Sequence, residues 1–163
     1  MKHFLLSLFI LFTFSVSAQT PSVKRFADLV NMHNIDSVTA YIGKLGYVKG
    51  TEIPQIGNMY EFAVTSFAKK DTSVVKSSIS YSSGHHYAMN QGPLSVSLNY
   101  STSSAAEFDT LVAEIKTLGA EKITKEANTN VSQYKLGEYI VSTFYNPIDK
   151  GSKYTISLSA NLW

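Results

Sequence analysis

The segment Leu94-Ser95-Val96-Ser97-Leu98-Asn99-Tyr100 alternates apolar side chains with hydroxyl or amide side chains, and this alternation decides the fold class. Successive side chains of a β-strand point to opposite faces of the sheet, so such a strand has one apolar and one polar face. Residues 154–162 repeat the same alternation up to the end of the chain. Two strands of this kind predict an antiparallel sheet that is covered on a single side.

Four further segments have the same period of two and predict more strands of this sheet. They are residues 60–65, 75–81, 134–136 and 138–145. The last two flank Gly137, a residue type that suits the tight turn of a hairpin.

Elsewhere the apolar residues recur with the period of a helix. The clearest stripe runs from Phe108 to Leu118, and it begins at a capping box formed by Ser104 and Glu107. Gly119 ends it in the left-handed position that glycine adopts without strain. Two earlier stripes predict helices around residues 26–30 and 38–45, and Gly46 ends the second of them.

Together these elements predict an α+β domain of two layers, with helices on one face of an antiparallel sheet. The helix around 38–45 and the helix at 104–118 also match each other in their apolar residues and in the glycine that follows. The similarity favours two tandem repeats, residues 22–102 and 103–163, each a helix followed by strands. Chance similarity between amphipathic elements is the alternative.

Both matched helices end in a Leu-Gly joint, in Lys44-Leu45-Gly46-Tyr47 and in Thr117-Leu118-Gly119-Ala120. In this joint and in element order the chain resembles the β-lactamase inhibitor protein and its relatives. That resemblance implies a two-repeat module whose uncovered sheet face meets a partner. The paired cysteines of that family are missing here, and no motif is matched residue by residue, so no inhibitory residue is carried over.

The first eighteen residues predict a signal peptide. Lys2 precedes an apolar run from Phe4 to Val16, and small residues surround a cleavage site before Gln19. The run is shorter than the roughly 20 apolar residues that span a membrane. We therefore expect residues 1–18 to be removed and residues 19–163 to form a single domain in the periplasm or outside the cell.

The composition of the chain excludes several classes of function. The chain has no cysteine, which suits an oxidising compartment and excludes thiolate chemistry. Its net charge is +2, and Lys2 in the leader accounts for part of it. A nearly neutral mature chain has no long-range field for nucleic acid or acidic membranes, so we expect neither as a partner. The sequence does not predict an oligomeric state.

The most reactive-looking segment is residues 82–87, which carries the adjacent His85 and His86 and is predicted to be the loop between the second and third strands. A metal-dependent hydrolase using both histidines is one alternative. Zinc sites need at least three ligands, and neighbours in an extended segment point to opposite faces. Glu107 is assigned to the capping box, and Glu114 and Glu121 to a solvated face. We therefore assign no catalytic, metal-binding or cofactor-binding residue.

The polar sides of the predicted strands form a second candidate site. If these strands are neighbours, small hydroxyl side chains form a flat surface that loses little entropy when a partner binds. A merely solvated surface is the alternative. The loops 82–93 and 146–153 border it, and most tyrosines are assigned to the core except Tyr87 and Tyr145. The candidate partner-binding residues are Ser78, Ser80, His85, His86, Tyr87, Ser95, Ser97, Asn99, Tyr145, Ser157 and Ser159.

The sequence thus favours an exported, non-enzymatic binding or inhibitory module for a protein or glycan partner. A small outer-membrane β-barrel is a further alternative, suggested by the number of alternating strands and the terminal Trp163. Against it, Trp163 is out of phase with the apolar face of its strand. The capped helix at 104–118 also has no place in a short-looped barrel.

Overall fold

The computed structural model describes residues 21–57, 60–71, 74–86, 94–123, 130–149 and 153–162. The predicted leader, Tyr87 and Trp163 lie outside these ranges. Within them the elements are α1 (Val23–Asn31), α2 (Ile35–Lys44), β1 (Val48–Gly57), β2 (Tyr60–Asp71), β3 (Val74–His86), β4 (Leu94–Thr102), α3 (Ala105–Thr117), β5 (Glu121–Lys122), β6 (Val131–Leu136), β7 (Tyr139–Tyr145) and β8 (Tyr154–Leu162).

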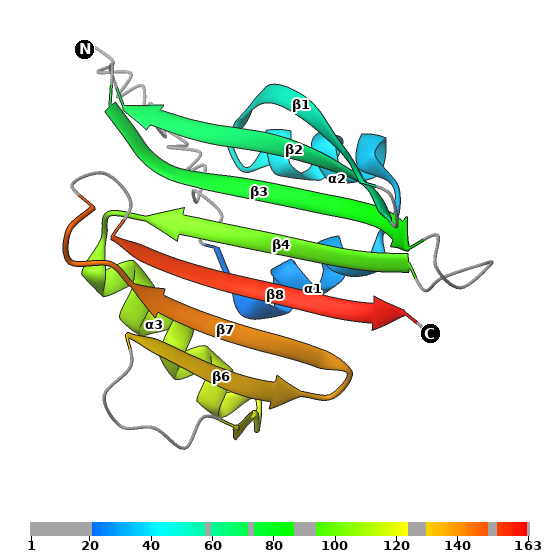
Figure 1. Ribbon diagram of the computed structural model, residues 1–163. Coiled ribbons are helices and arrows are strands. Elements are labelled where there is room, and N and C mark those ends of the chain that lie inside the picture. The colour runs from blue at the N-terminus through cyan, green and yellow to red at the C-terminus, as the bar shows by residue number, and fades with distance from the viewer. Residues whose placement is uncertain are drawn as a thin grey trace, which may run out of the picture.

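The described strands form one open antiparallel sheet of eight strands in the order β1-β2-β3-β4-β8-β7-β6-β5 (Figure 1). The first four strands follow one another across one half of the sheet, and the last four run across the other half in reverse order. Strands β4 and β8 therefore meet at the centre, where Leu98 pairs with Leu158 and Ser97 with Ser159. This register aligns the apolar sides of the two alternating segments on the same face of the sheet.

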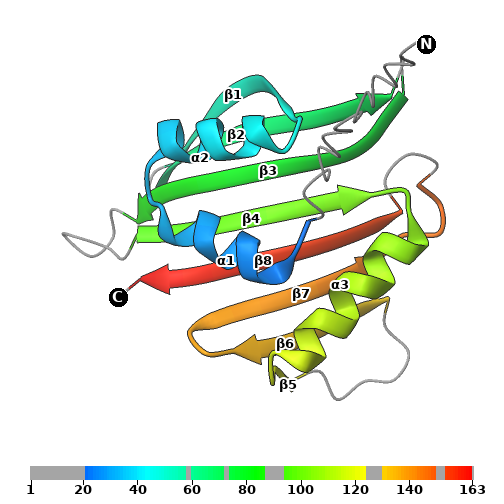
Figure 2. The same cartoon turned by 180° about the vertical axis from the view of Figure 1, so that it is seen from behind.

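All three described helices cover that face, as Figure 2 shows, and leave the other face open. The α+β class with helices packed on an antiparallel sheet is therefore confirmed. The core between the layers combines helix and strand residues, and Phe26 of α1 packs on Tyr100 of β4 with ring centroids 5.2 Å apart. Its largest fully buried side chains are Tyr81, Tyr100, Phe26, Phe67, Leu29, Ile42, Ile79, Leu98, Leu111, Ile115, Ile156 and Leu158. None of the described helices has the length and apolar character needed to span a membrane.

The predicted ends of the helices are present. Ser104 is the N-cap of α3, and its side chain accepts a hydrogen bond from the Glu107 amide. Gly46 and Gly119 follow the C-caps of α2 and α3 with φ angles of 83° and 79°. These left-handed conformations suit glycine because it has no Cβ to clash with the preceding carbonyl.

Glu114 differs from its prediction, because it does not belong to a solvated helix face. Its two carboxylate oxygens accept hydrogen bonds from the amides of Val23, at 2.8 Å, and Lys24, at 3.2 Å. The first amides of a helix have no partner within the helix, and a negative charge there also interacts favourably with the helix dipole. A side chain of α3 therefore caps α1 and ties the two helices together.

The loop predicted at residues 82–87 is also corrected. Residues 82–86 extend strand β3, where His85 pairs with Glu61 of β2 and with Leu94 of β4. Gly84 is buried there rather than in a turn, and a Cβ at this position would lie 2.7 Å from Cα of Phe62. Glycine therefore lets strand β2 and the ring of Phe62 approach β3 closely.

Candidate functional site

The open face of the sheet carries hydroxyl side chains in rows that cross several strands. One row joins Ser66, Ser80, Asn99, Ser157 and Ser142 on consecutive strands of the sheet. The neighbouring rows join Ser78, Ser101 and Thr155 on one side, and Ser82, Ser97 and Ser159 on the other. Ser95 lies on the same face of β4, so the structure brings together all seven of the predicted sheet residues: Ser78, Ser80, Ser95, Ser97, Asn99, Ser157 and Ser159.

Some of these hydroxyls bond to each other, and others have no bond within the chain. Ser101 Oγ lies 3.0 Å from Thr155 Oγ1. Within the described ranges, the side chains of Ser80, Ser97 and Ser157 make no hydrogen bond, and all three are half-buried among their neighbours. A hydroxyl can both donate and accept. These serines therefore offer donors and acceptors from positions that the strand register holds fixed.

Exposed apolar side chains flank the hydroxyl rows of this face. On one side Ile53 of β1 pairs with Val64 of β2 and remains 53% exposed. On the other side Ile140 and Phe144 of β7 are 37% and 40% exposed and pair with Ser159 and Thr155. The surface thus combines an uncharged polar centre with apolar side chains on both sides of it, and Lys135 of β6 pairs with Ile140 farther out.

Of the remaining predicted residues, Tyr145 does not join this surface, and the side chains of His85, His86 and Tyr87 lie outside the described part of the chain. Tyr145 pairs with Tyr154 at the end of β7, and their rings stack at 5.2 Å. Tyr154 in turn packs on Phe108 of α3, so Tyr145 lies on the helix side of the sheet. His85 and His86 are the last residues of β3, and Tyr87 lies outside the described ranges. The described residues contain no group of three His, Cys, Asp or Glu side chains suited to a metal ion.

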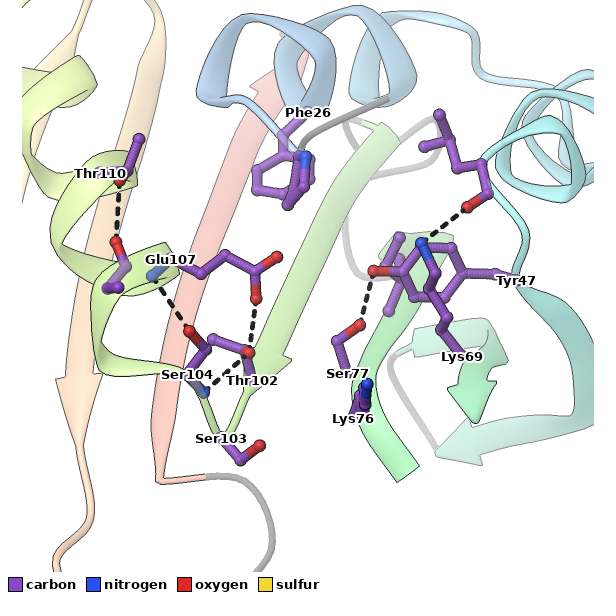
Figure 3. Close-up of a pocket in the computed structure, with 14 residues that line it drawn as sticks. Phe26, Tyr47, Lys69, Lys76, Ser77, Thr102, Ser103, Ser104, Glu107 and Thr110 are labelled. Atoms are coloured by element: carbon purple, nitrogen blue, oxygen red, sulfur yellow. Dashed lines mark hydrogen bonds between the residues drawn. The ribbon is translucent and has the colours of Figure 1, made fainter. Parts of the chain in front are cut away.

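A second candidate site, which the sequence analysis did not find, is a cavity of about 720 Å³ on the helix side of the sheet. Figure 3 shows that it lies between α3 on one side and the turn that links α2 to β1 on the other, above the ends of β3 and β4. We call it the helix-side cavity. It is lined by Pro21, Phe26, Leu45, Tyr47, Lys69, Lys76, Ser77, Ile79, Thr102, Ser103, Ser104, Ala106, Glu107 and Thr110.

Glu107 lies in this cavity because the predicted capping box is incomplete. The Ser104 amide donates to Thr102 Oγ1 at 3.1 Å, so the Glu107 carboxylate is not needed there. Instead, Thr102 Oγ1 donates to Glu107 Oε2 at 2.6 Å (Figure 3). The carboxylate is therefore held at the cavity wall by one of its two oxygens, which corrects its assignment to the cap.

Two lysines line the opposite part of the cavity. Lys69 Nζ donates to the Leu45 carbonyl at 3.4 Å and lies 5.7 Å from the centre of the Tyr47 ring. Lys76 lies at a β-bulge, where the pairing of β2 with β3 shifts by one residue. A bulge changes the direction of the side chain it carries, and here it brings Lys76 to the same cavity as Ser77.

The hydroxyls of Tyr47 and Ser77 line the cavity, and the buried Tyr100 lies behind them. Tyr47 OH and Ser77 Oγ form a hydrogen bond of 2.8 Å. The hydroxyl of Tyr100 is buried and has no hydrogen-bond partner among the described residues. Its burial, together with the neighbouring Tyr47 and Glu107, raises the pKa of Tyr100 far above its usual range. Burial also raises the pKa of Tyr47, although the bond to Ser77 partly opposes this.

The sequence contains one local signal for the cavity, the Ser104 to Glu107 capping motif. The other lining residues come from α1, the end of α2 and three strands, and only the packing of the helices on the sheet brings them together. The chain matches no protein-family model, no curated protein and no solved structure. Both sites therefore have to be interpreted from their own chemistry.

Proposed function

We propose that the chain is an exported, non-enzymatic binding or inhibitory module that contacts a protein or glycan partner through its open sheet face. The observation that supports this proposal is the set of cross-strand hydroxyl rows around Ser80, Ser97 and Ser157. Their side chains have no hydrogen-bond partner among the described residues, so a bound partner can use them.

The size of the face suits a specific interface. Six neighbouring strands span roughly 24 Å at the usual strand spacing, and a strand of nine residues is roughly 30 Å long. The resulting area of about 700 Å² is close to the roughly 800 Å² that each partner buries in a standard protein interface. This face alone is therefore large enough to bind another folded domain or a folded protein that the chain inhibits.

The chemistry of the face also restricts the partner. Small serine side chains lose little rotamer entropy on binding, and their positions are fixed by the backbone of the sheet. An uncharged hydroxyl centre requires matching donors and acceptors, such as amide groups or sugar hydroxyls. The exposed Ile53, Ile140 and Phe144 beside the hydroxyl rows require apolar contacts.

The order of the strands supports the idea that residues 22–102 and 103–163 are tandem repeats. Each half places its helices before four strands, and the two sets of strands meet at the β4–β8 pair. In this proposal the binding face is built from both repeats, and its hydroxyl centre lies at the junction between them.

The test is capture of partners from the exporting cell and on a glycan array with wild-type protein and two variants. Ser97→Arg places a long charged side chain in the middle of the hydroxyl surface. Thr117→Arg, on an exposed position of α3, is the matched control. We expect the partners retained by wild-type protein to be lost with Ser97→Arg and kept with Thr117→Arg. Equal retention by all three proteins would refute the proposal.

A further inference from the structure

We propose that the helix-side cavity binds a small amphipathic organic acid that also carries a hydrogen-bond donor, the class that includes aromatic and aliphatic hydroxy acids. This site is separate from the open sheet face, because the cavity lies on the other side of the sheet (Figures 2 and 3). The proposal therefore adds a small-molecule ligand to the partner proposed above and does not depend on it.

The charges that line the cavity favour an anion. Lys69 and Lys76 contribute two positive charges and Glu107 one negative charge, so the lining carries a net positive charge. Lys69 is fixed by its bond to the Leu45 carbonyl, and two of its three protons remain for other acceptors. A carboxylate near both lysines would form charge-assisted hydrogen bonds, which are stronger than neutral ones.

Glu107 adds the second requirement. An ionised carboxylate only accepts hydrogen bonds. Oε2 already accepts from Thr102, and Oε1 has no hydrogen bond among the described residues. A ligand that placed a carboxylate against Oε1 would be repelled. A ligand hydroxyl would instead donate to it, so the acid needs a donor group at a distance from its own carboxylate oxygens.

The apolar part of the lining gives the third requirement. Phe26 and Ile79 are each 1% exposed and Leu45 is 7% exposed, and all three belong to the core while lining the cavity. The volume of about 720 Å³ is within the usual range of small-molecule pockets. An apolar ring or branched chain can therefore pack beside Phe26 while the polar groups reach the lysines and Glu107.

The buried hydroxyl of Tyr100 lies behind the lining of the cavity. It is next to Ser77, Tyr47 and Glu107, three residues that do line the cavity. Because Tyr100 itself is not part of the lining, the hydroxyls of Tyr47 and Ser77 are the groups that a ligand would meet there.

The experiment is isothermal titration of three ligands that differ by one group. 3-(4-Hydroxyphenyl)propionate has an acid, an aromatic ring and a hydroxyl at the far end of the ring, 3-phenylpropionate lacks the hydroxyl, and 3-(4-hydroxyphenyl)propan-1-ol lacks the acid. We expect saturable binding of 3-(4-hydroxyphenyl)propionate with a Kd of about 1 mM or tighter, and at least about tenfold weaker binding of the other two. Equal affinity for all three, or no saturation by 3-(4-hydroxyphenyl)propionate up to about 10 mM, would overturn the proposal.

Variants of the chain localise the binding. Lys76→Met and Glu107→Gln keep the size of each side chain and remove its charge, and we expect each to weaken 3-(4-hydroxyphenyl)propionate binding about tenfold. The controls are Lys24→Met and Glu121→Gln, which change the same residue types at exposed positions outside the cavity and should change the Kd less than about twofold. Unchanged affinity in both cavity variants would contradict the proposed site.

The same titration separates this proposal from the first one. Ser97→Arg changes only the open face, so it should leave 3-(4-hydroxyphenyl)propionate binding unchanged even where it abolishes partner capture. Loss of acid binding in Ser97→Arg would show that the ligand does not use the helix-side cavity.

Discussion

Polar side chains are arranged differently on the two faces of the sheet. On the open face, Ser80, Ser97 and Ser157 repeat one small hydroxyl group at regular spacing, and the sheet register alone sets their positions. In the helix-side cavity, different polar groups from several elements are held by individual bonds, such as that between Thr102 and Glu107. A broad surface of repeated small groups suits an extended partner, whereas a few distinct and fixed groups in a concave site suit a small ligand.

Substitutions of two adjacent residues of β4, one on each face of the sheet, should give the largest difference between the two faces. Leu98 is completely buried, and Leu98→Ala should lower the free energy of unfolding by about 2–5 kcal/mol through lost apolar burial and a residual cavity. Ser97→Ala on the open face should change it by less than about 0.5 kcal/mol. Urea denaturation followed by circular dichroism measures both. Similar losses in the two variants would mean that the faces do not differ as described.

The next largest effect is expected at Gly84, where strands β2 and β3 approach closely. Gly84→Ala should destabilise the fold by about 1–3 kcal/mol, because its Cβ would press against the backbone of Phe62. Gly43→Ala in α2 is the matched control, since no atom lies within 4 Å of its added Cβ. There the change should be neutral or stabilising by up to about 1 kcal/mol. Thermal unfolding of both variants checks this, and a harmless Gly84→Ala would argue against the close approach.

The buried tyrosines on the helix side of the sheet also predict that the stability of the fold depends on pH. Burial raises the pKa values of Tyr81 and Tyr100 above 10.0, so these residues stay protonated in the folded chain while they ionise in the unfolded one. The unfolded state then binds fewer protons, and stability falls as pH rises above about 10, by at most about 1.4 kcal/mol per pH unit for each such tyrosine. Below that pH neither residue contributes to the dependence.

Denaturation curves between about pH 8 and pH 11 measure this slope. Tyr100→Phe should remove the contribution of one tyrosine from this slope. The substitution also removes a hydroxyl that has no partner among the described residues. Identical slopes in wild type and Tyr100→Phe would show that Tyr100 ionises equally in both states.

The smallest expected effect concerns the link between α3 and α1. Glu114→Gln removes the charge that faces the first amides of α1, and we expect a loss of about 1 kcal/mol. Glu121→Gln at an exposed position should change stability by less than about 0.5 kcal/mol. Chemical denaturation of both variants at low salt tests the difference, which should shrink when salt screens the charges. Equal effects would mean that Glu114 does not act through α1.

Local patterns predicted most of the secondary structure. The alternation around Ser97 and Leu98 gave the strands their two faces, and the stripe from Phe108 to Leu118 gave α3 its buried side. The prediction was wrong about residues 82–86, because a glycine that follows two serines resembles a turn. Only the structure shows that the strand and ring of Phe62 pack against this glycine. Similarly, Glu107 was expected to complete a capping box, since the competing Thr102 lies outside that four-residue motif.

By itself, the sequence determined the three helices, the centres of six of the eight described strands and which side of those six is apolar, whereas β1 and β5 were not predicted. These properties depend on neighbours two to four positions away, so they can be seen without a fold. Only the tertiary structure decided that β4 lies beside β8, that the serines form continuous rows, and that Glu114 caps a helix 91 residues away. The helix-side cavity also results from the tertiary structure. Lys76 and Glu107 line the same cavity from different elements, and that depends on strand register and helix docking rather than on any local pattern.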